Sequence, residues 1–351
     1  MDMERVVMLY QEKSNAGNRY RNEYLSGIPE LLERQRAVSD QRCAAYFSDI
    51  NRERERYRQD FIKMLGWPLT EPTEYSCEHD CASSVSVTLV AEDELSSIFR
   101  LQMTVLGGLK NYAMLFLPRG TKPCPVAIIQ HGGGGTPELC AHFFSDSNYN
   151  NMTRRLLKRG IALLSPQLLL WRKGRFGKGY NRVYVDGQLK QLGGSVAALE
   201  IYGIQRWIDY LQTRADLDTG ALGMTGLSYG GFYTLFATAA DPRICAAYSS
   251  CFFNSRYRYD WTDWTWTGAA ERFLDAEVGA LVCPRPLYIE IGRDDPLFDC
   301  EAGQTEFLRL KAFYESAGVG DRVRLAVNAG VHEYAKGDEG IDFLIRHMSA
   351  H

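Results

Sequence analysis

The chain has 351 residues, 45% of them hydrophobic and 24% charged, and a formal net charge of −3. This composition is typical of a globular protein with a sizeable core, and the weakly acidic balance does not favour a nucleic-acid partner. The sequence has no apolar run of signal-peptide or transmembrane length, so we expect a cytoplasmic protein with no membrane partner. Its nine scattered cysteines favour buried, reduced thiols.

Residues 1–66 have the pattern of amphipathic helices, because apolar residues recur every three or four positions between charges. Gly66 and Pro68 end the pattern. We predict a helical extension over 1–82 that packs on the main domain or on a second copy, so a homo-oligomer through these helices is one expectation. The "CEHDC" run at 77–81 has no second cluster at zinc-finger spacing, and we expect no metal site there.

From residue 83 to 351 we predict one domain built mainly from alternating strands and helices. Residues 83–93, 98–108 and 110–120 have the pattern of an antiparallel meander. Apolar runs then predict strands at 125–130, 161–166, 221–226, 244–251, 286–292 and 323–330, with helices at 149–160, 195–214, 230–240, 302–318 and 340–349. This alternation indicates an α/β fold with a mostly parallel central sheet covered by helices on both faces.

The segment Gly226-Leu227-Ser228-Tyr229-Gly230 matches G-x-S-x-G between a predicted strand and a predicted helix. In such a turn a serine has a strained backbone, and glycines around it prevent collisions with the neighbouring strand and helix. Ser228 is therefore the candidate nucleophile.

A second glycine-rich segment, "HGGGG" at 131–135, follows the predicted strand 125–130. Glycines let backbone N–H groups approach a substrate oxygen, as an oxyanion hole requires. A flexible turn or a phosphate cradle is the alternative, although no P-loop lysine or dinucleotide fingerprint follows. We expect the N–H groups of Gly133, Gly134 and Tyr229 to form the oxyanion hole.

Two further loops after predicted strands carry an acid and a histidine. Asp294, Asp295 and Asp299 compete for the role of the acid that orients an imidazole. Of the six histidines, only His332 lies in a loop after a strand and downstream of both Ser228 and these aspartates. The chain order Ser, Asp, His is that of a hydrolase triad.

These motifs together resemble the α/β-hydrolase superfamily, and within it esterases of the acetyl-xylan-esterase-like and dienelactone-hydrolase-like kinds. The resemblance covers about residues 85–351 and depends on "HGGGG", "GLSYGG", "CPRPLYIEIGRDDPLF" and "AGVHEY". It implies that Asp295 is the acid of the triad and that His332, in the family's G-x-H pattern, is the base.

An aromatic segment at 251–267 follows the strand after the nucleophile helix. Exposed aromatic rings there would bind sugar rings or a small acyl group, and a hydrophobic lid or a subunit contact is the equal alternative. The candidate substrate-binding residues are Phe252, Trp261, Trp264 and Trp266.

We therefore expect a serine hydrolase of carboxylic esters, with a short-chain acyl ester such as an acetylated sugar as its small-molecule substrate. We expect no metal or organic cofactor. A peptidase or amidase with the same triad, and a non-catalytic binding protein on the same fold, are the alternatives. The sequence does not identify the acyl group, the alcohol or the oligomeric state.

Overall fold

The computed structural model describes residues 12–70, 85–143, 147–171 and 179–348. The chain divides into two compact units, Met1–Ser48 with Ala270–Arg272 and Asp49–Ala269 with Phe273–His351. The smaller unit contains the helices α2 (Asn18–Ser26) and α3 (Ile28–Tyr46). Helix α4 (Ile50–Leu65) belongs to the larger unit, in which the Arg58 guanidinium donates to the carbonyl oxygens of Ala239 and Leu281. An N-terminal helical extension is therefore present, as predicted.

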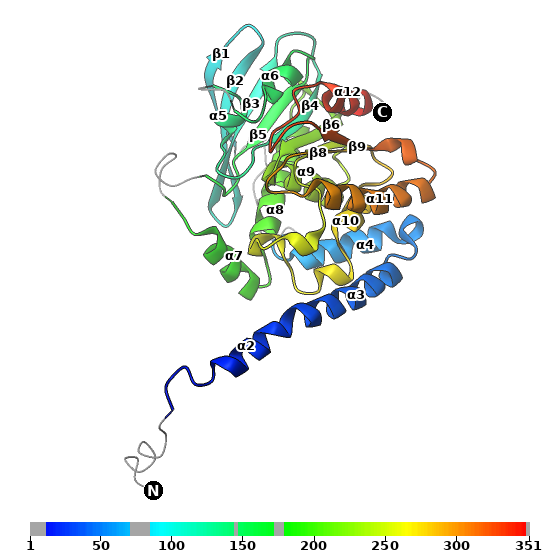
Figure 1. The fold of residues 1–351 in the computed structure, drawn as a ribbon. Coiled ribbons are helices and arrows are strands. Elements are labelled where there is room, and N and C mark those ends of the chain that lie inside the picture. Colours follow the sequence, from blue (N-terminus) through cyan, green and yellow to red (C-terminus); the bar gives the residue numbers. More distant parts are fainter. Residues whose placement is uncertain (1–11, 71–84, 144–146, 172–178, 349–351) are drawn as a thin grey trace. The chain divides into compact units, whose positions relative to one another are not determined.

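The larger unit is built on a nine-stranded sheet with the order β1-β2-β3-β5-β4-β6-β7-β8-β9 (Figure 1). Its strands are β1 (Val85–Glu92), β2 (Ser96–Leu106), β3 (Leu109–Pro118), β4 (Cys124–Gln130), β5 (Ala162–Pro166), β6 (Leu217–Leu227), β7 (Ala246–Ser250), β8 (Leu287–Gly292) and β9 (Val323–Asn328). The first three strands and β5 pair antiparallel, and all remaining pairs are parallel. The predicted meander and mostly parallel sheet are confirmed.

Helices cover both faces of this sheet. The strands β5, β7 and β8 are therefore buried along their whole length. The helices of this unit after α4 are α5 (Pro137–Cys140), α6 (Met152–Leu157), α7 (Arg182–Gln191), α8 (Val196–Gln212), α9 (Tyr229–Ala240), α10 (Asp275–Val282), α11 (Cys300–Ser316) and α12 (Glu339–Met348). Buried side chains of α6 and α12 share one core cluster, whereas α8, α9 and α10 pack together elsewhere on the sheet (Figure 1). Helices α5, α7 and α10 were not expected from the sequence.

Within the described ranges, no helix is long and apolar enough to span a membrane. The described cysteines carry free thiols, and all of them except Cys300 are buried. The "CEHDC" segment lies outside the described residues.

A buried ion pair holds the segment between β7 and α10. The Arg256 guanidinium contacts the carboxylate of Asp275 and donates to the carbonyl oxygen of Trp264 at 2.9 Å. Asp275 is fully buried and also accepts hydrogen bonds from the Asn254 N–H at 3.1 Å and the Tyr259 hydroxyl at 3.0 Å. One carboxylate therefore fixes residues 254–264 against the start of α10.

Replacing Asp275 by alanine is expected to lower the free energy of unfolding by about 3–5 kcal/mol, because the Arg256 cation stays buried without its partner. Urea denaturation of Asp275→Ala and wild type measures the difference. The matched control is Asp260→Ala in the same loop, where the side chain is exposed and the change should stay within about 0.5 kcal/mol. Equal losses in the two variants would contradict this role of Asp275.

Candidate active site

Ser228 lies at the turn between β6 and α9, at the carboxyl edge of the sheet. Its backbone has φ 63° and ψ −120°, a conformation that is strained for any residue with a side chain. The Ser228 N–H donates to the Ser250 carbonyl at 2.8 Å, and the Ser228 carbonyl accepts from the Phe232 N–H at 2.9 Å. These two bonds hold the strained turn, and the side chain is half-exposed above the sheet.

The glycines around Ser228 allow β4 to approach the turn closely. A Cβ atom on Gly230 would lie 2.0 Å from the carbonyl oxygen of Gln130, and one on Gly226 would lie 2.6 Å from the same oxygen. Both distances are impossible for non-bonded atoms. The positions are therefore restricted to glycine by the backbone of β4.

The loop after β4 lies directly against this turn. A Cβ atom on Gly132 would lie 3.2 Å from Cβ of Ser228, and one on Gly133 would lie 3.3 Å from Cδ2 of Tyr229. Among the described residues, the N–H groups of Gly133 and Tyr229 have no hydrogen-bond partner. The Gly134 N–H, in contrast, donates to the Leu170 carbonyl at 2.5 Å. The N–H of Gly134, one of the three expected oxyanion donors, is therefore already used in a hydrogen bond within the protein.

His131 at the start of this loop has a structural role. Its ring is fully buried, and the Leu168 N–H donates to Nε2 at 3.0 Å, so the proton is assigned to Nδ1, which lies 2.9 Å from the Gly132 carbonyl. Burial lowers the pKa of His131 to about 4. A neutral imidazole therefore links the glycine loop to the segment after β5.

His332 and Asp295 form a hydrogen-bonded pair after β9 and β8. The Nδ1 atom of His332 lies 2.8 Å from Oδ2 of Asp295. The other carboxylate oxygen of Asp295 accepts from the Leu297 N–H at 2.8 Å and the Phe298 N–H at 3.3 Å. The Asp295 side chain has no exposed surface, and 18% of the His332 side chain is exposed. The imidazole is therefore held by its inner nitrogen, in the way that a buried carboxylate orients a general base.

The other two candidate aspartates, Asp294 and Asp299, make different contacts. Asp294 is exposed, and its N–H donates to the Gly330 carbonyl at 3.2 Å. Asp299 caps α11 by accepting from the Ala302 N–H at 2.7 Å. Of the three, Asp295 alone contacts His332 among the residues that the structure covers.

Strand β7 ends between the Ser228 turn and the His332–Asp295 pair. Ser250 accepts the N–H of Ser228, and the next residue, Cys251, has its sulfur within 4.8 Å of side-chain atoms of both Asp295 and His332. Burial raises the pKa of the Cys251 thiol to about 12, and the thiol donates to the Glu333 carbonyl at 3.3 Å. The end of β7 therefore lies next to both parts of the candidate site, with Ser250 bonded to Ser228 and Cys251 beside the His332–Asp295 pair.

Sequence comparisons find similarity to known hydrolases. The protein-family model described as "X-Pro dipeptidyl-peptidase (S15 family)" matches residues 108–278 of the chain. The "Putative hydrolase YtaP" of Bacillus subtilis (strain 168) is 25% identical over 264 residues, which cover 71% of this chain and 87% of the relative.

Solved structures share the architecture at lower identity. A "putative acetyl xylan esterase (BF1801)" from Bacteroides fragilis NCTC 9343 superposes with a TM-score of 0.65 at 13% identity, covering 85% of this chain and 83% of the other. A glucuronoyl esterase from Solibacter usitatus superposes with a TM-score of 0.63 at 16% identity, covering 86% of this chain and 94% of the other. This chain has the α/β-hydrolase fold. The resemblance expected from the sequence is confirmed.

The histidine loop of this α/β-hydrolase fold is held by asparagines that the sequence analysis missed. The Asn148 side chain donates to the His332 carbonyl at 3.1 Å, and the Asn148 carbonyl accepts from the Tyr334 N–H at 2.8 Å. Asn150 donates to Glu333 Oε2 at 2.9 Å. The run "SNYNN" at 147–151 has no catalytic pattern, so sequence alone offered no signal for this contact.

A buried charge network in the α/β-hydrolase fold fixes Tyr229, which follows the candidate nucleophile. The Arg182 guanidinium binds Glu200 at 2.9 Å and Asp263 at 2.7 Å, and lies 5.3 Å from the centre of the Tyr229 ring. The Tyr229 hydroxyl donates to Asp263 at 3.0 Å. Arg182 also donates to the Leu169 carbonyl at 2.9 Å. The network joins α7, α8, α9 and the aromatic loop.

The aromatic loop differs from the expectation. Phe252 and Trp264 are 0% and 1% exposed, and both pack against the ring of Phe232 in α9. They offer no surface to a substrate in this structure, because their rings complete the core beside the nucleophile helix. Trp261 and Trp266 are half-buried, and Trp261 lies 5.9 Å from Phe298, whose ring stacks on His332.

Replacing Gly230 by alanine is expected to lower the free energy of unfolding by about 3 kcal/mol or more, because the new methyl group overlaps the Gln130 carbonyl. The matched control is Gly187→Ala in α7, where a Cβ atom meets nothing within 4 Å and should stabilise the helix by about 0.5–1 kcal/mol. Chemical denaturation of both variants makes the comparison. A Gly230→Ala protein as stable as wild type would contradict the close approach of β4.

The neutral state of His131 predicts a specific pH dependence. Its pKa in the folded chain is below the ordinary value of 6.5, so its contribution to stability is complete above pH 6.5 and is lost as the pH falls towards about 4. The loss is about 3 kcal/mol. Long-range ¹H–¹⁵N NMR should show an Nδ1–H imidazole that does not titrate above about pH 5. A His131 signal that titrates near pH 6.5 would overturn this prediction.

Proposed function

We propose that the protein is a serine hydrolase of carboxylic esters in which Ser228, His332 and Asp295 form the triad. The observation that carries the proposal is the 2.8 Å bond from the His332 imidazole to buried Asp295. Both side chains lie near Cys251 at the end of β7, and the carbonyl of the preceding Ser250 accepts the Ser228 N–H. Nε2 of His332 takes the proton of the attacking hydroxyl and returns it to the leaving alcohol. Asp295 holds the required tautomer and stabilises the imidazolium.

The developing oxyanion is bound by the N–H groups of Gly133 and Tyr229. Both belong to segments in contact with each other beside Ser228, and the Tyr229 N–H is the first of the α9 helix, where the helix dipole favours negative charge. Gly134, expected from the sequence as a donor, supports the loop through its bond to Leu170. Water then repeats the attack on the acyl-enzyme and releases the acid.

The substrate is a small ester with a short acyl group, attached to an alcohol such as a sugar. Support comes from the names of the similar structures, which include acetyl xylan esterases, glucuronoyl esterases and a methylesterase. A series of p-nitrophenyl esters from acetyl to octanoyl tests the acyl preference. A steep preference for acetyl is the expected result.

Cleavage of an X-Pro dipeptide is the second candidate, because the model of the S15 family matches residues 108–278. The same triad serves both reactions, so the substrate decides between them. Faster release of p-nitroaniline from an X-Pro anilide than of p-nitrophenol from the acetate would favour the peptidase.

Substitutions at the adjacent residues Asp294 and Asp295 distinguish a member of the proposed triad from a neighbouring residue outside it. Ser228→Ala should lower kcat on p-nitrophenyl acetate by about 10⁴ to 10⁶ and Asp295→Asn by about 10⁴, because the second change removes the carboxylate that orients His332. Asp294→Asn is the matched control and should keep kcat within about twofold of wild type, since its side chain is exposed. Equal effects of the two aspartate changes, or an active Ser228→Ala protein, would overturn the triad.

A further inference from the structure

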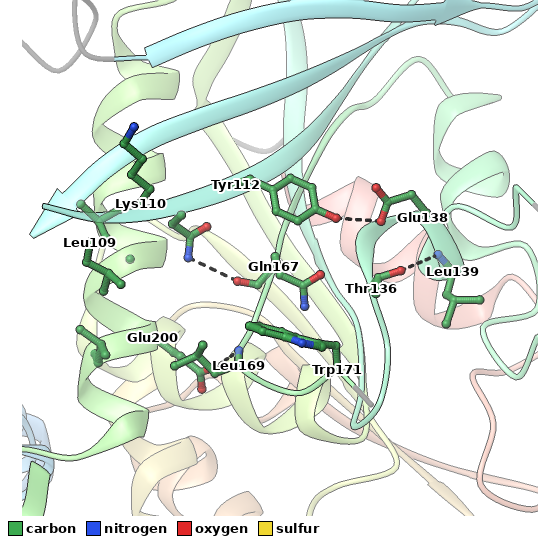
Figure 2. Close-up of a pocket in the computed structure, with 14 residues that line it drawn as sticks. Leu109, Lys110, Tyr112, Thr136, Glu138, Leu139, Gln167, Leu169, Trp171 and Glu200 are labelled. Carbon is green, nitrogen blue, oxygen red and sulfur yellow. Dashed lines mark hydrogen bonds between the residues drawn. The ribbon is translucent and has the colours of Figure 1, made fainter. Parts of the chain in front are cut away.

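A cavity of about 640 Å³ lies at the same edge of the sheet as Ser228. Its walls come from the β2–β3 hairpin, the loops after β4 and β5, and helix α8 (Figure 2). Strand β3 runs antiparallel to β5, with Ala113 opposite Pro166, so the start of β3 lies beside the carboxyl end of β5. Pockets of this size in proteins hold ligands as large as a drug molecule, far larger than an acetyl group.

The wall of this cavity contacts the groups that hold the candidate oxyanion loop. The Gln167 side chain lies 3.1 Å from Nε2 of His131. The Glu200 carboxylate binds Arg182, which stacks over the Tyr229 ring. Thr136 directly follows the glycine run. The cavity is therefore built against the scaffold of the reacting centre.

Most polar side chains of the wall are bonded to the protein itself. Asn111 donates to the Gln167 carbonyl at 3.3 Å and accepts from Trp207 Nε1 at 3.1 Å. Glu138 accepts from the Tyr112 hydroxyl at 2.8 Å. Glu200 accepts from the Leu169 N–H at 2.6 Å. These bonds use much of the hydrogen-bonding capacity of the wall apart from the exposed Lys110, and they give the cavity a fixed shape.

Most of the remaining surface of the cavity, apart from Lys110, is apolar and partly aromatic. Figure 2 shows the rings of Tyr112 and Trp171 around the cavity together with the side chains of Leu109, Leu139 and Leu169. Flat rings and branched aliphatic side chains make favourable contacts with the face and edge of an aromatic group. A planar, apolar ligand fits this surface better than a polar one.

We propose that this cavity binds an aryl group carried by the alcohol part of the ester. The inference rests on the proposed function, in which a small acyl group reacts at Ser228 and the alcohol is the larger part of the substrate. A bound aryl group holds the ester against the oxyanion loop, so it raises kcat/KM for aryl esters and leaves small alkyl esters unaffected.

Gly203 in α8 lines the cavity and has room for the first atom of a side chain, so a larger residue there would fill the cavity. A Cβ atom there would meet only the Asn111 side-chain nitrogen, at 3.7 Å. Gly203→Phe should lower kcat/KM for 2-naphthyl acetate by about tenfold or more and change kcat/KM for ethyl acetate by less than about twofold. Gly203→Ala is the matched control and should change neither by more than about threefold. Equal losses on both esters, or no loss on 2-naphthyl acetate, would overturn the proposal.

Binding of 2-naphthol to the Ser228→Ala protein tests the cavity without catalysis and without a new side chain in it. Calorimetry should give a Kd of about 1 mM or tighter, and the Ser228→Ala, Gly203→Phe double variant should bind at least tenfold more weakly. Absence of binding to Ser228→Ala would overturn the cavity proposal whatever the activities are. Hydrolysis that survives in Ser228→Ala would instead overturn the triad, while the binding result still decides the cavity.

Discussion

The site depends on the close approach of two backbones, that of β4 at Gln130 and that of the turn after β6. This approach holds Ser228 in a strained conformation and brings the glycine loop within contact of Ser228 and Tyr229. The strain is maintained by the surrounding packing, as is usual at functional sites. The opposite side of the turn is equally constrained, because a Cβ on Gly231 would lie 2.5 Å from the Ser250 carbonyl. Three neighbouring strands thus define one position for the hydroxyl.

The charge states of the side chains that support the Ser228 turn depend on their burial and on their partners. A neutral His131 supports the glycine loop, whereas the charged Arg182 is compensated by two carboxylates and holds the Tyr229 side chain. Neither group needs to change its charge during the proposed reaction, so the proposed site would be organised before an oxyanion forms. The side chain of His332 is 18% exposed, and its outer nitrogen is the one that transfers the proton in the proposed reaction.

Much of this arrangement could be predicted from the sequence, because it depends on local signals. The G-x-S-x-G turn, the glycine run and the alternation of strands and helices each have a short-range physical cause, and so the fold was predicted correctly. Contacts between segments that are far apart in the sequence have no local pattern that predicts them. The hydrogen bonds of Asn148 and Asn150, and the charge partners of Arg182, join segments that only the tertiary structure brings together. The loop with Phe252 and Trp264 was misjudged because aromatic residues look alike whether they face a ligand or a core.

The link from Asn148 to the His332 loop spans 184 positions of the chain and has a consequence for how the protein is made. During synthesis the Ser228 turn and the glycine loop emerge early, and they can pack as soon as β4, β6 and β7 are available. The imidazole joins them only after β9 has left the ribosome and docked beside β8. Contacts so distant in sequence form late and slowly. A nascent chain would therefore carry a folded Ser228 turn before His332, the proposed base, has joined it.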